Sequence, residues 1–328
     1  MKNIYICNTY YHVLISIIKS IKYPLLNDLM IVKEPYDDTE LNEEFLLRLN
    51  EKKIFNNIII INFKKYYFHT RNLFTNICNR FKWINSISKI EFNKSSYKNI
   101  YIYNDSTSFG KYLNDNKISY NLLEDGENCY KTIPGYKDSL FVNLSKKIFG
   151  LSLPKLATSN LINSIEVNDD KDLYINNKKI TVKNKKKLYQ TLTQEEIKLI
   201  IDIFIGKIDY KFINGTVLLL TQPLEECLNC SEKEKIAIYK KLIEENLNEN
   251  EQLVIKPHPR ETTNYSKYFS SAIVLQSSFP FEILSLSKQL TFNKALTIKS
   301  TAINCLNLGK NKKIEKGLEW AKKVKNSL

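Results

Sequence analysis

The chain has 328 residues, of which 43% are hydrophobic, and its formal net charge is +14. This length suits two folded domains, and eight glycines with eight prolines are too few for a fibrous or linker-rich protein. The basic charge suits anionic small molecules or a membrane surface. Because neither a zinc-finger spacing nor an aromatic RNA-binding motif accompanies the lysines, we do not expect a nucleic-acid partner.

The first residues lead directly into an apolar strand at residues 4–7, without the apolar core and cleavage site of a signal peptide. The longest apolar runs, such as residues 58–61, are too short to span a bilayer. We therefore expect a cytoplasmic protein. Basic segments at 137–147 and 310–325 leave open a peripheral contact with the inner face of an anionic membrane, although a solvated helix face is the simpler interpretation of both.

Short β-branched runs alternate with helical patterns in the first part of the chain, which predicts a mostly parallel sheet covered by helices. The helix predicted at 11–21, for example, carries its aliphatic residues on one face. The predicted strands are residues 4–7, 29–32, 58–61, 100–103 and 119–123, and the predicted helices are residues 11–21, 40–49, 71–81 and 108–116.

The region from 134 to 212 is less regular. It contains a basic helical pattern at 136–149, a hairpin pattern with an Asn-Asn turn at 173–180 and a helical pattern at 194–205. A second alternating unit follows. Its predicted strands are residues 217–220, 253–256, 272–275 and 289–292, and its predicted helices are residues 232–245, 281–286 and 301–306.

Two successive alternating units predict an α/β protein with two Rossmann-like domains facing across a cleft. We expect an N-terminal domain at residues 1–150, a connecting region at 151–212 and a C-terminal domain at 213–328. Ligands in such sheets bind beyond the carboxyl ends of the strands, so polar residues that directly follow a strand are the candidates for function.

The sequence Lys256-Pro257-His258-Pro259 directly follows a predicted strand. The two prolines restrict the backbone on either side of His258. A cationic or hydrogen-bonding imidazole suits an anionic leaving group, and Lys256 adds positive charge beside it. A solvated basic turn is the alternative, but the position after a strand and the flanking prolines favour a functional histidine.

Glu124-Asp125-Gly126 follows another predicted strand. Adjacent carboxylates disfavour ionisation of both, so one of them can act as a base. Acidic loops are common at strand ends, and this tripeptide alone does not establish a role. His12 follows the first strand and faces the expected cleft, which leaves open an acceptor-binding role or a packing role.

Two further motifs begin helices. Glu282 lies two residues after Pro280, where a carboxylate either complements the helix dipole or accepts the hydroxyls of a ribose. Ser300 and Thr301 lie between a predicted strand and a helix, where they either bind phosphate or cap the helix.

The order Glu-Asp-Gly, His-Pro, Pro-x-Glu and Ser-Thr resembles that of bacterial sialyltransferases. In length and pattern the chain is most similar to glycosyltransferase family 52, which includes lipooligosaccharide and capsule sialyltransferases. The opening residues 4–12 also look like the first strand and acceptor-side loop of that family. This resemblance implies a GT-B fold. It also implies transfer of sialic acid from CMP-sialic acid to a terminal sugar such as galactose of a surface glycan, by a single inverting displacement.

The resemblance also implies roles for residues of the donor site. His258 would assist departure of the CMP phosphate, and Glu282 would hold the ribose hydroxyls. The remaining donor contacts would be Lys256 and Pro259 near the cytosine and Ser300 and Thr301 at the phosphate.

The base is less defined by the resemblance. It would be the first acidic residue of the Glu-Asp-Gly motif, Glu124, with Asp125 beside it. Members of family 52 can instead use an acid of the second domain, and Glu225 and Glu226 are the candidates there.

We expect no metal and no cofactor besides the donor substrate. Asp170-Lys171-Asp172 lies in the irregular region and not at a strand end, and Cys227 and Cys230 lack the partners of a zinc site. The sequence leaves open a transferase that uses CMP-Kdo or a nucleotide hexose, a noncatalytic nucleotide- or glycan-binding protein, and a basic nucleic-acid binder. It also leaves open a homodimer.

Overall fold

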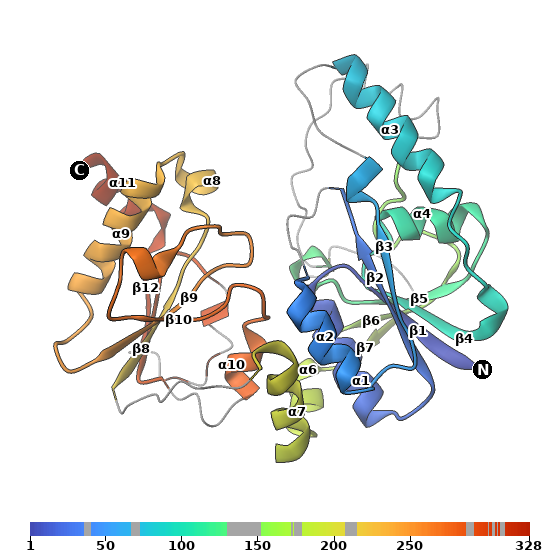
Figure 1. Cartoon of the computed structure of the whole chain (residues 1–328), viewed down its shortest axis with the longest axis horizontal. Helices are drawn as coiled ribbons and strands as arrows, with labels where there is room; N and C mark the ends of the chain where they lie inside the picture. Colours follow the sequence, from blue (N-terminus) through green and yellow to red (C-terminus); the bar gives the residue numbers. More distant parts are fainter. Residues whose placement is uncertain are drawn as a thin grey trace. The chain divides into compact units, whose positions relative to one another are not determined.

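A computed structural model describes residues 1–35, 41–66, 73–129, 152–171, 173, 179–206, 215–286, 292–300, 302–303, 306, 308 and 312–328. The chain forms two compact units, each built on its own parallel sheet (Figure 1). Unit 1 contains Met1–Glu40 and Leu49–Leu192, and unit 2 contains Leu41–Arg48 and Thr193–Leu328. The expected α/β class with two Rossmann-like sheets is thus confirmed, whereas the facing of the two units across a cleft stays a prediction.

The sheet of unit 1 has the order β3-β2-β1-β4-β5-β6-β7, and all neighbouring strands are parallel. The strand order reverses between β1 and β4, and ligands of such sheets bind at the carboxyl ends beside this switch point. The strands are β1 (Lys2–Cys7), β2 (Asn27–Lys33), β3 (Ile58–Asn62), β4 (Tyr97–Ile102), β5 (Tyr120–Leu123), β6 (Ile162–Val167) and β7 (Ile180–Val182).

Helices pack on both faces of this sheet because both faces of its central strands are apolar. Alternate residues of β1, Ile4 and Ile6, share a buried cluster with Trp83 of α3 and Phe109 of α4. On the opposite face, the Cys7 thiol contacts Ser16 of α1 at 3.3 Å. The helices of unit 1 are α1 (Tyr10–Lys22), α3 (Leu73–Ile87), α4 (Ser108–Asp115) and α6 (Lys185–Gln190), with short 3-10 helices η1 (Lys64–Tyr66), η2 (Lys94–Ser96) and η3 (Gly126–Cys129).

The sheet of unit 2 has the order β10-β9-β8-β11-β12, again fully parallel, and its switch point lies between β8 and β11. Its strands are β8 (Thr216–Leu220), β9 (Gln252–Lys256), β10 (Ile273–Val274), β11 (Lys294–Thr297) and β12 (Lys313–Glu315). Its helices are α7 (Gln194–Phe204), α8 (Leu224–Leu228), α9 (Glu232–Glu244), α10 (Glu282–Leu286), α11 (Gly317–Asn326) and η4 (Tyr265–Lys267), and α2 (Glu43–Glu51) is divided between the units after Arg48.

Part of the region that we expected to connect the domains belongs to the two units. Strands β6 and β7 extend the first sheet, and α7 belongs to unit 2. In β6, the buried Ile162, Ile165 and Val167 alternate irregularly with polar residues, so no apolar run marks this strand in the sequence. The Asn-Asn turn of the predicted hairpin and the predicted helix at 136–149 lie outside the described residues.

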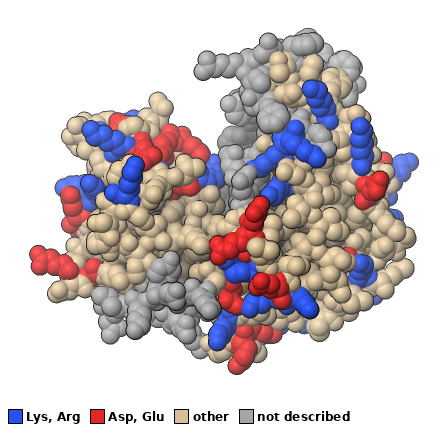
Figure 2. Space-filling view, viewed as in Figure 1, with Lys and Arg blue, Asp and Glu red and all other residues tan. Residues whose placement is uncertain are grey.

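The strand predicted at 289–292 lies almost entirely outside the described residues, and the strand that the structure has is β11, a few residues later. None of the helices in the described parts of the chain is long and apolar enough to cross a bilayer. Figure 2 shows lysine and arginine side chains lying among acidic ones on the face in view, which indicates that the excess positive charge is not gathered into one patch there.

Candidate functional site

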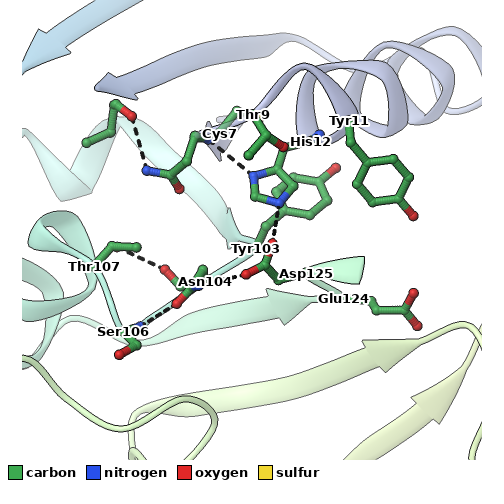
Figure 3. Close-up of polar contacts among 12 residues, drawn as sticks. Cys7, Thr9, Tyr11, His12, Tyr103, Asn104, Ser106, Thr107, Glu124 and Asp125 are labelled. Atoms are coloured by element: carbon green, nitrogen blue, oxygen red, sulfur yellow. Dashed lines mark hydrogen bonds and ion pairs between the residues drawn. The ribbon is translucent and has the colours of Figure 1, made fainter. Parts of the chain in front are cut away.

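Polar side chains meet beside the switch point of unit 1, where β1, β4 and β5 end (Figure 3). His12 lies in the first turn of α1, which follows β1, and Thr9 caps that helix by accepting a hydrogen bond from the His12 amide at 3.2 Å. Asn104 follows β4, and Asp125 follows β5. Figure 3 shows the side chains of His12 and Asn104 both directed at the Asp125 carboxylate.

The Asp125 carboxylate is held by both of its oxygens. The Nε2 atom of His12 lies 2.7 Å from Oδ1, and the Asn104 side-chain amide donates to Oδ2 at 2.6 Å. The backbone N–H of Asn8 donates to Nδ1 of His12 at 3.2 Å. Because Nδ1 accepts this hydrogen bond, the neutral ring carries its proton on Nε2 and donates it to Asp125.

His12 is only 2% exposed, and its ring stacks on Tyr103 with centroids 4.4 Å apart and planes 7° apart. The Tyr103 hydroxyl in turn contacts Ser16 at 2.9 Å. Burial raises the pKa of Tyr103 far above its ordinary value and that of Cys7 to about 12, so both groups stay protonated. The acceptor-binding role left open for His12 stays a prediction, while its burial and stacking agree with a packing role in which Nε2 also orients Asp125.

Glu124 occupies a different environment from its neighbour. Its side chain points away from His12 in Figure 3, forms an ion pair with Lys185 and accepts the backbone N–H of Asn168. It is 6% exposed, whereas the Asp125 side chain is 12% exposed. Gly126, with φ +53°, supplies the left-handed backbone that turns the chain after the two carboxylates. The geometry therefore favours Asp125 as the reactive carboxylate.

Lys256 ends β9 and is 4% exposed. Its ammonium group donates to the carbonyls of Pro257 at 2.9 Å and Ser277 at 3.1 Å, and it lies 4.5 Å from the centre of the Phe279 ring. Burial lowers the pKa of Lys256 to about 7, although the carboxylates of Glu261 and Glu282 oppose this shift. Lys256 thus ties the loop after β9 to the loop that precedes α10.

His258 lies in the loop after β9. Its Nδ1 atom accepts the backbone N–H of Arg260 at 3.2 Å, so the proton of the neutral ring is on Nε2. Burial lowers the pKa of His258 to about 4, and the positive charges of Arg260 and Lys256 add to this effect. The neutral imidazole can therefore donate a hydrogen bond to an anion through Nε2.

A buried carboxylate that the sequence analysis missed, Glu261, holds this loop. Its Oε2 atom accepts the backbone N–H of His258 at 3.0 Å and the hydroxyl of Thr221. Its Oε1 atom accepts the Tyr265 hydroxyl at 2.7 Å and lies 3.3 Å from the ammonium of Lys235, which is 1% exposed. The sequence does carry a signal for Glu261, because a glutamate three residues after His258 can reach back and accept the His258 amide, as in a capping box.

The two acids considered as an alternative base are both in ion pairs. Glu225 pairs with the buried Lys235 at 2.5 Å, and Glu226 pairs with Arg260 at 2.7 Å. The contact with the buried Lys235 gives Glu225 a structural partner, whereas the pair of Glu226 with Arg260 is about half exposed and adds little stability.

The other predicted donor residues also lie at the carboxyl end of the second sheet. Pro259 is exposed in the His258 loop, Glu282 begins α10, and Ser300 follows β11. Thr301 lies outside the described residues. Within the part of the chain that the structure describes, no three His, Cys, Asp or Glu side chains gather as metal ligands, and Cys227 and Cys230 are free thiols.

Comparisons with known proteins agree with this architecture. The model of glycosyltransferase family 52 matches residues 61–316. An uncharacterized protein of Haemophilus influenzae is 35% identical over 191 residues, which are 57% of this chain and 58% of that protein, so the match spans less than two thirds of the relative.

Three solved structures share the fold at 14% sequence identity and a TM-score of 0.53. An α/β-galactoside α-2,3-sialyltransferase of Photobacterium phosphoreum is matched over 98% of this chain and 94% of that one. A Photobacterium 2,6-sialyltransferase in complex with CMP and lactose is matched over 95% and 70%, and a UDP-GlcNAc 2-epimerase of Methanocaldococcus jannaschii over 100% and 92%. The fold is therefore that of GT-B transferases and epimerases.

Proposed function

Because the chain belongs to glycosyltransferase family 52, we propose that it transfers sialic acid from CMP-sialic acid to a terminal sugar, such as galactose, of a surface glycan. The observation that carries this proposal is the Asp125 carboxylate held between His12 and Asn104 at the switch point of unit 1. A carboxylate fixed there suits a base that receives the proton of an acceptor hydroxyl.

In the proposed reaction, the acceptor oxygen loses its proton to Asp125 and attacks the anomeric carbon of the sialic acid. The bond between that carbon and the phosphate oxygen of CMP breaks on the opposite side, so the configuration inverts. His12 donates to Oδ1 of Asp125, which fixes the direction of the carboxylate and stabilises its charge before the reaction.

In this proposal, His258 stabilises the leaving group. CMP departs with the bonding electrons and gains negative charge on its phosphate, and the Nε2–H of His258 donates a hydrogen bond to it. The low pKa of His258 makes the imidazole a neutral donor in the free protein. A bound phosphate would raise this pKa, because a nearby negative charge favours the imidazolium.

The remaining predicted residues would hold CMP at the carboxyl end of the second sheet. Lys256 and Pro259 lie near the cytosine in this proposal, Glu282 accepts the ribose hydroxyls, and Ser300 with Thr301 binds the phosphate. The support is their common position after strands β9 and β11 and at the start of α10.

A donor comparison tests the proposal. Purified protein is incubated with lactose and with CMP-sialic acid, CMP-Kdo, a UDP-hexose or a GDP-hexose, with and without EDTA, and the products are identified by mass spectrometry. We expect a sialylated product from CMP-sialic acid alone, at the same rate in EDTA. Turnover of another donor would assign a different transferase activity, and binding without turnover would indicate a noncatalytic protein.

A further inference from the structure

A cavity of about 370 Å³ in unit 1 has five lysines in an otherwise largely apolar wall. It lies between α1, the ends of β5 and β6, and the segment from residue 183 to residue 191. The cationic side chains in its wall belong to Lys19, Lys22, Lys183, Lys185 and Lys187, and among the described residues of the wall the carboxylates are those of Glu124 and Glu166.

The two glutamates compensate only part of this charge. Glu166 pairs with Lys19 and, at 2.9 Å, with Lys183. Burial lowers the pKa of Lys19, and Glu166 opposes this shift more strongly than Lys183 and Lys185 add to it. The hydrogen bond to Glu166 raises the pKa of Lys183, so both lysines already respond to one negative charge, and an anion bound among them would act in the same direction.

The cavity adjoins the residues that hold the proposed base. Tyr103 lines it, and the same ring stacks on His12, which donates to Asp125. Glu124, the neighbour of Asp125 in the sequence, also lines it through its ion pair with Lys185. The cavity thus lies next to the residues that hold Asp125, although His12 and Asp125 are not part of its wall.

On the basis of the proposed function, we propose that the lysine-lined cavity binds a carboxylate or phosphate carried by the acceptor glycan, so that the enzyme selects acidic acceptors. Ammonium groups recognise both anions as point charges. Lys183 and Lys187 are exposed and are placed to meet an incoming anion, whereas Lys19 is buried in the wall. The carboxylate of the donor's own sialic acid could bind the same lysines. The KM for CMP-sialic acid distinguishes that possibility from binding of the acceptor's anion.

The test compares lactose with lactose 1-phosphate as acceptors at saturating CMP-sialic acid. We expect wild-type kcat/KM to be about tenfold higher for lactose 1-phosphate, and the Lys183→Gln/Lys187→Gln variant to lose this preference while its rate with lactose is unchanged. The matched control, Lys94→Gln/Lys186→Gln, removes the same charge from exposed lysines outside the cavity and should keep the preference.

Two results would overturn the proposal. One is an equal kcat/KM for both acceptors in the wild type. The other is a KM for CMP-sialic acid that rises in Lys183→Gln/Lys187→Gln, which would assign the cavity to the donor carboxylate.

Calorimetric titration with lactose 1-phosphate separates this inference from the proposed function, because it needs no turnover. If the protein turns over none of the donors, the proposed function is wrong, and the titration still shows whether the cavity binds the phosphate of lactose 1-phosphate. Binding that is at least tenfold weaker in Lys183→Gln/Lys187→Gln, and unchanged in the control, supports the cavity. Equal affinity in both variants contradicts it.

Discussion

At the scale of single residues, two histidines are held in defined tautomers by backbone amides. The amide of Asn8 donates to Nδ1 of His12, and the amide of Arg260 donates to Nδ1 of His258. Each ring is therefore left with Nε2 as its donor. In His12 this donor is directed at Asp125, and in His258 we propose that it meets the leaving phosphate.

Replacing each of the two neighbouring carboxylates by its amide should distinguish a loss of catalysis from a loss of stability. Asp125→Asn should lower kcat by about 10² to 10⁴, because an amide cannot accept the acceptor proton. Glu124→Gln should lower kcat far less and lower the melting temperature more, because it removes the partner of Lys185. Steady-state kinetics and thermal unfolding of both variants measure this. A larger loss of kcat in Glu124→Gln would transfer the role of base to Glu124.

The titration of His258 gives a second prediction. Its folded pKa of about 4 lies below the ordinary value of 6.5, so the unfolded chain binds more protons between these two pH values. Stability should accordingly rise with pH across this window. The Cε1–H resonance of His258, followed by NMR from pH 3 to 8, should titrate near 4 and shift to higher pH with CMP. A free-protein midpoint near 6.5 would contradict the burial of the ring.

At the scale of elements, a buried network of hydrogen bonds and an ion pair around Glu261 stabilises the loop after β9. Glu261 accepts hydrogen bonds from the His258 amide, Tyr265 and Thr221, and pairs with Lys235. This network crosses from β9 to β8 and α9, so the position of His258 depends on residues that never reach a ligand.

Glu261→Ala should lower the free energy of unfolding by about 3–5 kcal/mol, because it leaves a buried lysine without one of its carboxylates and the His258 amide without its acceptor. The matched control is Glu245→Ala, which breaks the half-exposed pair with Lys316 and should cost about 1 kcal/mol or less. Urea unfolding of both variants gives the comparison, and similar losses would argue against a structural role for the network.

The success of the sequence analysis varied from element to element. Strands such as β1, β2 and β8 are almost continuously apolar because both of their faces are covered, and they were predicted within a few residues. The strand β6 was missed because its polar residues interrupt the pattern, and β11 because its four residues, KALT, suit a helix equally well.

For the site residues, the sequence pattern gives the strand ends at which they lie but not the direction of each side chain. The rule that polar residues after parallel strands approach a ligand pointed to Glu124, Asp125 and His258, which the structure places at the carboxyl ends of the strands of their sheets and whose roles stay predictions. It could not decide which of two adjacent carboxylates turns toward His12, because that depends on the backbone after β5 and on the position of Lys185, 61 residues later. Asn104 and Glu261 were missed, although Asn104 also follows a strand.

At the scale of the whole molecule, each unit carries one part of the proposed chemistry. The carboxylate lies in unit 1, and the proposed CMP site lies in unit 2. Ligand binding to unit 2 should thus be independent of Asp125, whereas transfer should need both units.

Binding of CMP should therefore stabilise the wild type and Asp125→Asn equally. At a hundred times its Kd, a ligand adds about 2.7 kcal/mol to the free energy of unfolding, which is readily seen in a melting curve. Scanning calorimetry with CMP, UDP and GDP provides the measurement. A larger shift with UDP or GDP than with CMP would point to another class of donor.

In the proposed function, the chain is a sialyltransferase whose His258 acts on the phosphate of the leaving CMP. The most direct measurement is the initial rate of CMP release and sialyl-lactose formation by wild type and His258→Ala at saturating CMP-sialic acid. We expect both products to form together in the wild type. We also expect both rates to fall by about 10² to 10⁴ in His258→Ala, in a variant that still unfolds as cooperatively as the wild type. Turnover by His258→Ala at the wild-type rate would contradict this role of His258.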